Sequence, residues 1–255
     1  MKKHIRVVAI LVIFVLSLVS FVACSPKTIK QGDFAYIVKN NNAYLVGITQ
    51  SGQEKEELIL PKYVNGKEVI KMYYYEFIAY SSAARIKSEN LKKLFIMGEN
   101  FKTSELGYQS DNPNLTKVIR IVIDFENRPS YGVGNYYVPY SLNYSYANYI
   151  GHGFRIKYAN ISYMQNYEGS EQNNEGYYWV DHENYGKMIS PPPSPSRSEY
   201  TFDGWYKEPS CSNKWNFEVD TLPEEIIEEI KNDKDEMIER PIYQNTYLYA
   251  KWTKK

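Results

Sequence analysis

The stretch 200-YTFDGWYKEPSCSNKW-215 is dense in aromatic residues and decides how the C-terminal part of this chain folds. Tyr200 and Phe202 point to one face of a strand, because side chains alternate along a strand with period two. Plain alternation would place Gly204 next on that face and Trp205 on the other. A β-bulge at Asp203-Gly204 inserts one residue and returns Trp205 to the face of Phe202, and glycine tolerates such a kink.

Two later segments also alternate apolar and other residues, so each would place its apolar side chains on one face of a strand. Trp215, Phe217 and Val219 alternate in 214-KWNFEVD-220, and every second residue of 247-YLYAKW-252 is again apolar. Burial of one large aromatic side chain contributes roughly 2–3 kcal/mol, so these strands together predict one small core. The expected core residues are Tyr200, Phe202, Gly204, Trp205, Trp215, Phe217, Leu248, Ala250 and Trp252.

Residues 200–206, Trp215 and residues 248–252 closely resemble the internalin B-type repeat found in Listeria and Bacteroides surface proteins. The resemblance covers roughly residues 153–253 and implies a compact β-grasp-like module that serves as a spacer or in adhesion. Within it, 191-PPPSPSRS-198 is an extended, proline-rich segment. This segment is either a rigid crossover inside the module or a ligand for a proline-binding domain.

The chain departs from the resembled repeat by an insertion of about twenty residues before its last strand. The insertion predicts a helix near residues 222–242, since Pro223 suits a helix start and Glu224-Glu225 suits its N-terminal dipole. Pro241 would end this helix. A solvated helix on a loop and a helix that docks a partner both fit the pattern.

Residues 33–150 contain an internal repeat. The segments 90-NLKKLFIMGENF-101 and 114-NLTKVIRIVIDF-125 match at an offset of 24 residues, which aligns Lys93 with Lys117 and Leu94 with Val118. Repeats of this length stack short strands to bury a shared face. Together with 57-ELILPKYVNGKEVIKM-72, they resemble BspA-type leucine-rich repeats. The alternative is an irregular β-rich domain in which two strands match by chance.

The N-terminal residues have the pattern of an export signal. Lys2, Lys3 and Arg6 precede an apolar run over residues 7–22, which is short for a membrane span and suits a signal peptide. The run ends at 21-FVAC-24, which resembles a bacterial lipobox. We therefore expect a signal peptide over residues 1–23, lipidation of Cys24 and a tether over residues 24–32, at the outer face of the bacterial cytoplasmic membrane. An uncleaved anchor is the alternative.

Charge and composition exclude several classes of function. Loss of the three basic residues of the signal peptide leaves 27 Lys and Arg against 30 Asp and Glu, a net charge of −3. This balance argues against a nucleic-acid partner. Cys211 lies in a polar turn, and Asp181-His182-Glu183 is expected at a surface turn, so no metal site, cofactor or catalytic group is predicted.

The sequence as a whole predicts a β-rich α+β fold: a short leucine-rich-repeat-like β module followed by a small β-grasp-like repeat domain. We expect a non-catalytic, acyl-anchored surface protein that binds a protein or a glycan. A structural spacer is the alternative, and a cell-wall hydrolase is a weaker one. The candidate binding surface consists of Tyr131, Tyr136, Tyr137, Tyr140, Tyr144 and Tyr146. The alternative for these residues is ordinary packing at β edges.

Overall fold

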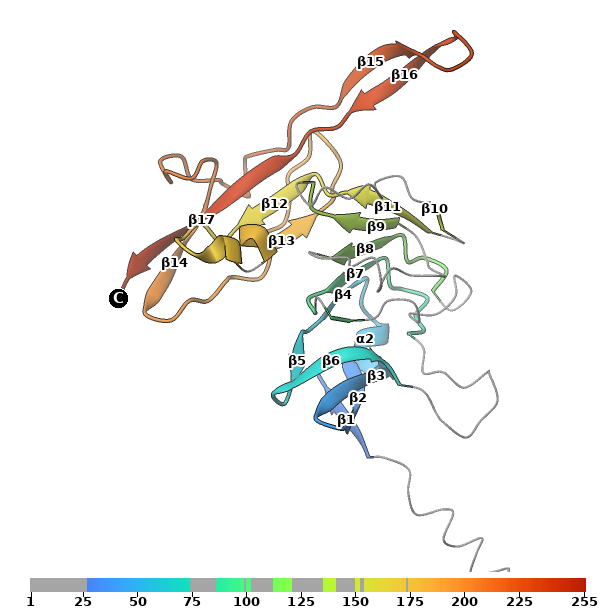
Figure 1. The fold of residues 1–255 in the computed structure, drawn as a ribbon, viewed down its shortest axis with the longest axis vertical. Coiled ribbons are helices and arrows are strands. Elements are labelled where there is room, and N and C mark those ends of the chain that lie inside the picture. The colour runs from blue at the N-terminus through green and yellow to red at the C-terminus, as the bar shows by residue number, and fades with distance from the viewer. Residues whose placement is uncertain are drawn as a thin grey trace, which may run out of the picture.

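The computed structural model describes residues 27–73, 86–98, 100–101, 112–120, 135–140, 150–151, 154–172 and 174–255. The expected β-rich class is confirmed, because the described residues form strands in four sheets (Figure 1). The described helical segments are short: α2 (Gln50–Gln53), η3 (Ser170–Gln172) and η4 (Asn174–Gly176).

The first sheet has five strands in the order β1-β2-β3-β6-β5. Asn40 and Asn41 both have positive φ, as a tight hairpin turn between β2 and β3 requires. β1 pairs with β2, so the last part of the expected tether is an edge strand. The strands are β1 (Thr28–Gln31), β2 (Phe34–Lys39), β3 (Asn42–Ile48), β5 (Tyr63–Val64) and β6 (Lys67–Met72).

The second sheet has the order β10-β11-β9-β8-β7-β4, and the strands from β11 to β4 run parallel. Lys93 pairs with Lys117, and Leu94 with Val118, so the register follows the 24-residue offset of the sequence. The strands are β4 (Glu57–Leu60), β7 (Lys93–Ile96), β8 (Lys117–Arg120), β9 (Asn135–Val138), β10 (Ile150–Gly151) and β11 (Phe154–Tyr158).

The place of β11 corrects the expected boundary between the two modules. We expected the repeat domain to begin at residue 153, but β11 pairs in parallel with β9 and completes the second sheet. Ile156 is buried in the core beneath that sheet. The C-terminal domain therefore begins after β11, near Ala159.

The C-terminal domain is built on a four-stranded sheet in the order β13-β12-β17-β14. β17 lies inside this sheet, parallel to β12 and antiparallel to β14. The register shifts between Phe202 and Gly204, which confirms the predicted bulge, and Gly204 has φ 118°. The strands are β12 (Ile161–Met164), β13 (Tyr177–Asp181), β14 (Tyr200–Tyr206) and β17 (Thr246–Lys254).

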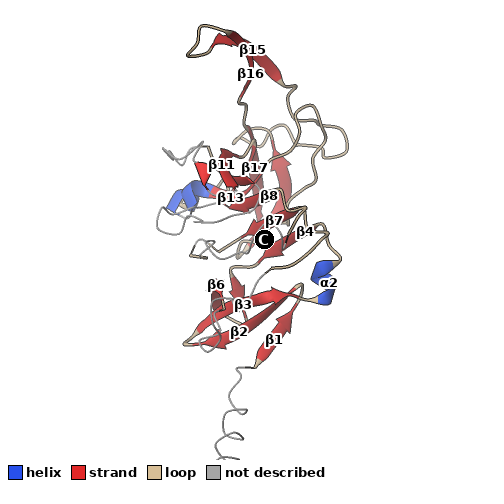
Figure 2. Ribbon diagram, turned by 90° about the vertical axis from the view of Figure 1, so that its right-hand side faces the viewer, coloured by secondary structure: helices blue, strands red, loops and turns tan. Residues whose placement is uncertain are grey.

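The predicted helix near residues 222–242 is wrong. This segment forms the two-stranded hairpin β15 (Ile226–Lys231) and β16 (Met237–Ile242), which extends away from the rest of the molecule (Figures 1 and 2). β-branched isoleucines favour strands. The Asn232 side chain also fixes the turn, since its Oδ1 accepts hydrogen bonds from the amides of Lys234 and Glu236 at 2.9 and 3.0 Å.

Buried apolar side chains form two clusters. The first lies between the first sheet and the inner face of the parallel sheet, and includes Leu94 and Tyr136. The second lies between the outer face of the parallel sheet and the C-terminal domain, and includes Phe95 and Trp179. Of the expected core residues, the second cluster contains Trp205, Trp215, Leu248 and Ala250, with Phe202, Phe217 and Trp252 partly buried against it.

Tyr200 lies outside these clusters. Its ring instead contacts the guanidinium of Arg197, with 3.8 Å between the Arg197 Cζ and the ring centroid. Tyr200, the first residue of the predicted aromatic face, therefore lies at the margin of the C-terminal domain and makes a cation–π contact there.

Candidate functional site

Alternation along the parallel strands creates an outer face that meets the C-terminal domain. On β7 and β8, Leu94 and Val118 enter the first core, whereas Phe95 and Ile119 point to the second. The Phe95 ring packs against Trp179 of β13, with 4.5 Å between the ring centroids. The junction between the two modules is therefore an aromatic packing surface.

A charged cluster lies in the same junction. The Lys93 side chain is 7% exposed, and its Nζ donates to both carboxylate oxygens of Asp181 at 3.1 Å and to Glu183. Lys117 occupies the equivalent position on β8 and donates to the carbonyl oxygen of His182 at 2.6 Å. Asn160 holds the backbone of Glu183 in place, because its side chain donates to and accepts from that backbone at 2.7 and 3.0 Å.

The cluster is arranged so that its charges compensate each other. Burial opposes the charged form of Lys93, but Asp181, Glu183 and Glu57 outweigh it and raise the pKa of Lys93. Burial also raises the pKa of Asp181, and Lys93 only partly offsets this effect. For Glu183, burial is outweighed by Lys93 and Lys117, so its pKa lies below the ordinary value.

His182 points away from the two acids and stacks on Tyr137, with 4.2 Å between the ring centroids. Burial and the positive charges of Lys117 and Lys157 lower its pKa to about 4. The expected surface turn at residues 181–183 is therefore a partly buried junction. Asp181 and Glu183 converge on one ammonium group, while His182 serves as a neutral packing surface.

The junction is open along one side, where it forms a groove of about 520 Å³. β4 lies beyond the area that the C-terminal domain covers, and its Ile59 is 40% exposed. Met188, 59% exposed, and the proline-rich segment that connects β13 with β14 form the opposite wall. The lining residues are Glu57, Ile59, Lys93, Phe95, Trp179, Asp181, Glu183 and 188–193.

The predicted tyrosine surface is wrong for two of its members. Tyr136 is completely buried beneath the parallel sheet, and Tyr137 is 5% exposed within the junction. Neighbouring residues of β9 face opposite sides, and both sides of this sheet are covered, so neither ring reaches the surface. Tyr140 is 50% exposed and stacks on Tyr243, with 4.9 Å between the ring centroids. Tyr131, Tyr144 and Tyr146 lie outside the described residues, as does Cys24.

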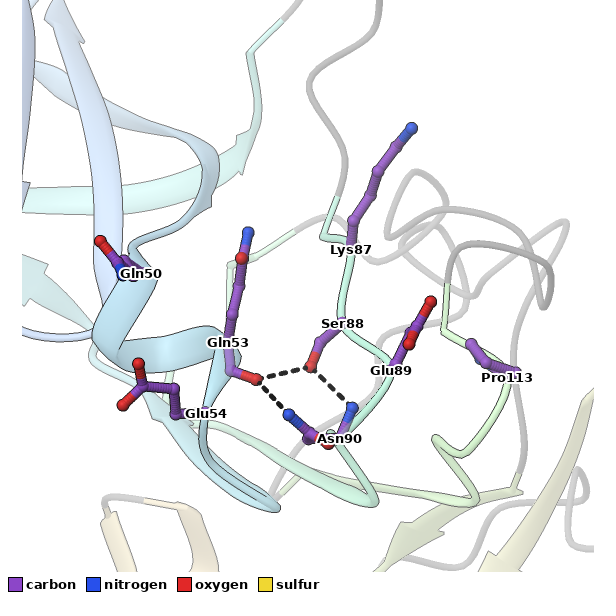
Figure 3. Close-up of a pocket in the computed structure, with 8 residues that line it drawn as sticks. All are labelled: Gln50, Gln53, Glu54, Lys87, Ser88, Glu89, Asn90 and Pro113. Atoms are coloured by element: carbon purple, nitrogen blue, oxygen red, sulfur yellow. Dashed lines mark hydrogen bonds between the residues drawn. The ribbon is translucent and has the colours of Figure 1, made fainter.

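A second hollow, of about 660 Å³, lies between α2 and the segment before β7 (Figure 3). Its polar groups bond to one another: the carbonyl oxygen of Gln53 accepts from Ser88 Oγ at 3.4 Å and from Asn90 Nδ2 at 2.9 Å. The backbone N–H of Asn90 in turn donates to Ser88 Oγ at 3.2 Å. This arrangement closes the loop against α2, and we assign no ligand to it.

Other features that bear on function concern the described residues alone. Among them, no group of three or more His, Cys, Asp and Glu side chains is arranged to hold a metal ion. None of their helices has the length and apolar character needed to cross a membrane. Cys211 is a partly buried free thiol, and burial raises its pKa.

The C-terminal part of the chain is similar to a known family of repeats. The family model of the Listeria-Bacteroides repeat domain matches residues 160–227. The match begins just after β11 and ends at the start of the β15–β16 hairpin, and it does not include the segments with the 24-residue offset. No curated protein and no solved structure matches the chain.

Sequence reasoning missed the junction, although one signal for it was present. Lys93 and Lys117 align at the 24-residue offset, and stacked repeats place such residues side by side. Two neighbouring ammonium groups on a sheet face need carboxylates close by. Asp181 and Glu183 are those carboxylates, but they are far away in sequence and nothing local indicates the pairing.

Proposed function

We propose that this protein is a non-catalytic binding or adhesion module for a protein or a glycan, held by an acyl group on Cys24 at the outer face of a bacterial cytoplasmic membrane. The observation that carries the proposal is the groove between the two modules. Ile59 and Met188 are exposed at its rims, and Glu57 adds a carboxylate whose side chain is 61% exposed. A groove with apolar rims and a small set of charged groups that compensate each other suits recognition.

The state of the acidic residues supports a non-catalytic role. Asp181 and Glu183 are the partly buried carboxylates of the groove, and the ammonium of Lys93 lies between them. Both carboxylates bind the same ammonium, so neither is free to take a proton from a substrate as a general base. We therefore do not favour the hydrolase alternative for this site.

The identity of the N-terminal module and of the anchor belongs to the same proposal. The parallel strands with a 24-residue register support a leucine-rich-repeat-like array. The segment 21-FVAC-24, at the end of an apolar run, supports a lipidated N-terminus. Substitution Cys24→Ser should abolish fatty-acid labelling of the protein in cells and release it from the membrane fraction. Retention of the label in that variant would exclude Cys24 as the lipidated residue.

Binding is tested with the full chain, purified in detergent and offered to cell-wall polymers, host matrix proteins and a glycan array. We expect saturable binding to one class, lost in the variant Ile59→Ser/Met188→Ser. Val219→Ser is the matched control, because Val219 is 69% exposed and does not line the groove. No binding by a chain that is shown to be folded would favour the spacer alternative.

A further inference from the structure

The β15–β16 hairpin exposes an unusual amount of apolar surface. Of the ten large hydrophobic side chains that are exposed in the described part of the chain, five lie on this hairpin. An isolated two-stranded hairpin is marginally stable in water, and it normally needs a further strand or a covering surface. The five residues are Ile226, Ile227, Met237, Ile238 and Ile242.

The base of the hairpin is nevertheless firmly attached to the C-terminal domain. Leu222 is buried just before β15. After β16, the amide side chain of Gln244 donates to the carbonyl oxygen of Glu224 at 2.9 Å, and the Tyr185 hydroxyl donates to the carbonyl oxygen of Gln244 at 3.1 Å. The hairpin therefore projects from the C-terminal domain (Figure 1) and is held at its base by these hydrogen bonds.

The two faces of the hairpin differ in how their charges are paired. On one face, Glu228 lies opposite Arg240, and its Oε1 accepts from the guanidinium at 2.6 and 3.0 Å. On the other face, Glu229 lies directly opposite Glu239. Like charges at opposed positions repel each other and destabilise the pair of strands. Lys231 also lies on this second face, but its ammonium donates to Asp235 in the turn at 2.6 Å, so the face has a place for a cation from outside the hairpin.

Apolar residues flank this acidic pair on both sides. On one side Ile227 lies opposite Pro241, and on the other Met237 lies opposite Lys231, so each side of the two glutamates includes an apolar side chain. Such a face complements a strand in which a lysine or arginine alternates with apolar side chains, because the aliphatic stem of the cation also packs on the apolar neighbours.

The hairpin has one edge suited to accept such a strand. Pro241 on β16 has no amide hydrogen, which blunts that edge for pairing. β15 contains no proline, and in the described structure it pairs with β16 alone. Its other edge therefore offers the backbone groups that strand addition requires.

A second copy of this chain is a poor occupant of that edge. The hairpin, residues 226–242, contains six Asp and Glu against three Lys and Arg, a net charge of −3, so two hairpins repel each other. Antiparallel pairing of two β15 strands about their centre would also place Glu228 of one copy opposite Glu229 of the other.

We propose that the β15–β16 hairpin docks an extended, basic and apolar segment of a partner protein, which adds as a strand beside β15 and places a cation next to Glu229. The hairpin shares no lining residue with the groove. The inference therefore goes beyond the proposed function and stands whether or not the groove binds a ligand.

The test measures the fluorescence anisotropy of a labelled twelve-residue peptide of alternating Lys and Val as the full chain is added in detergent. A Glu–Val peptide of the same length is the charge control. A Lys–Val peptide that is N-methylated at every second residue is the strand control, because it keeps the charge but loses amide donors along one edge. We expect saturable binding of the first peptide alone.

Two variants then locate the binding. Glu229→Gln should weaken binding about fivefold, the effect of one exposed ion pair. Asp233→Asn removes the same charge from the exposed turn and should leave binding nearly unchanged. Both changes lie on exposed side chains, so thermal melts should match those of the unmodified chain. Ile59→Ser/Met188→Ser should also bind the peptide normally, which separates this surface from the groove.

Several outcomes would overturn the proposal. Equal binding of the Glu–Val peptide would remove the role of charge, and equal binding of the N-methylated peptide would remove strand addition. Equal losses in Glu229→Gln and Asp233→Asn would reduce the effect to general charge. Dimerisation in sedimentation experiments that Glu229→Gln strengthens would make a second copy the occupant.

Discussion

Replacement of Lys93 by methionine should strongly destabilise the protein through the junction between its modules. Methionine keeps most of the side-chain volume beside Phe95 but removes the ammonium that lies 3.1 Å from Asp181. At an effective dielectric constant near 20, that contact alone is worth about 5 kcal/mol before desolvation is counted. Asp181, whose side chain is 15% exposed, would then lose its cation, while Glu183 would keep the ammonium of Lys117 at 3.4 Å, so we expect a net loss of about 3–5 kcal/mol.

This loss should lower the melting temperature by roughly 6–20 °C, as measured by circular dichroism. The matched control is Lys92→Met, the neighbouring residue, whose ammonium lies 2.7 Å from Glu56 with both side chains more than half exposed. An exposed pair of this kind contributes about 0–1 kcal/mol, so the control should melt almost normally.

The ion-pair argument also predicts a rescue. In Lys93→Met/Asp181→Asn the carboxylate that lost its cation is gone, while Glu183 keeps Lys117, and most of the lost stability should return. In the single variant, burial without the Lys93 cation keeps the pKa of Asp181 above its value in the unfolded chain. Relative to the unmodified chain, which has the same His182, the stability of the variant should therefore increase as the pH falls from about 7 towards 4, because the folded variant binds more protons at Asp181. Equal melting of Lys92→Met and Lys93→Met, or no rescue, would refute this account of the junction.

Three further predictions concern other parts of the fold. Gly204→Val should cost about 1–3 kcal/mol in chemical denaturation, because φ 118° is strained for a side chain at the bulge of β14; an unchanged midpoint would contradict the bulge. His182 should titrate by NMR at about pH 4. The unfolded state binds its proton first, near the ordinary value of 6.5, so stability should fall as the pH drops from there towards 4. A titration of His182 near pH 6.5 would mean that the junction is solvated. Trp205→Ala should cost about 3–5 kcal/mol, since this ring is 2% exposed in the second core; a loss near that of a surface substitution would place the ring outside the core.

The aromatic strands β14 and β17 could be predicted from sequence because the responsible residues are close together and alternate. The strand expected at residues 214–220 is wrong, because this segment forms a turn that leaves Val219 69% exposed. The bulge at Gly204 follows from local geometry, and the partner strand need not be known to infer that Trp205 shares a face with Phe202. The parallel register of Lys93 with Lys117 likewise appears in the sequence as an offset.

The predictions that failed concern a segment with competing helix and strand signals, and residues whose packing partners are distant in sequence. The segment that forms β15 and β16 has helix-start signals at Pro223 and strand-forming isoleucines further on, and the turn at Asn232 decides in favour of the hairpin. The burial of Tyr136 and Tyr137 depends on two different layers, one on each side of β9. No local pattern shows that both faces of this strand are covered.

The position of β17 determines how the C-terminal domain would respond to mechanical tension. β17 contains the last strand residues of the chain and runs parallel to β12, the first strand of its domain. A pull between the two ends of the chain slides these strands past each other in shear, which loads their hydrogen bonds together instead of opening them one by one. β14 holds β17 from its other side. Resistance to such a pull depends on the unfolding rate, so the domain should extend late under force while the exposed hairpin bears little of the load.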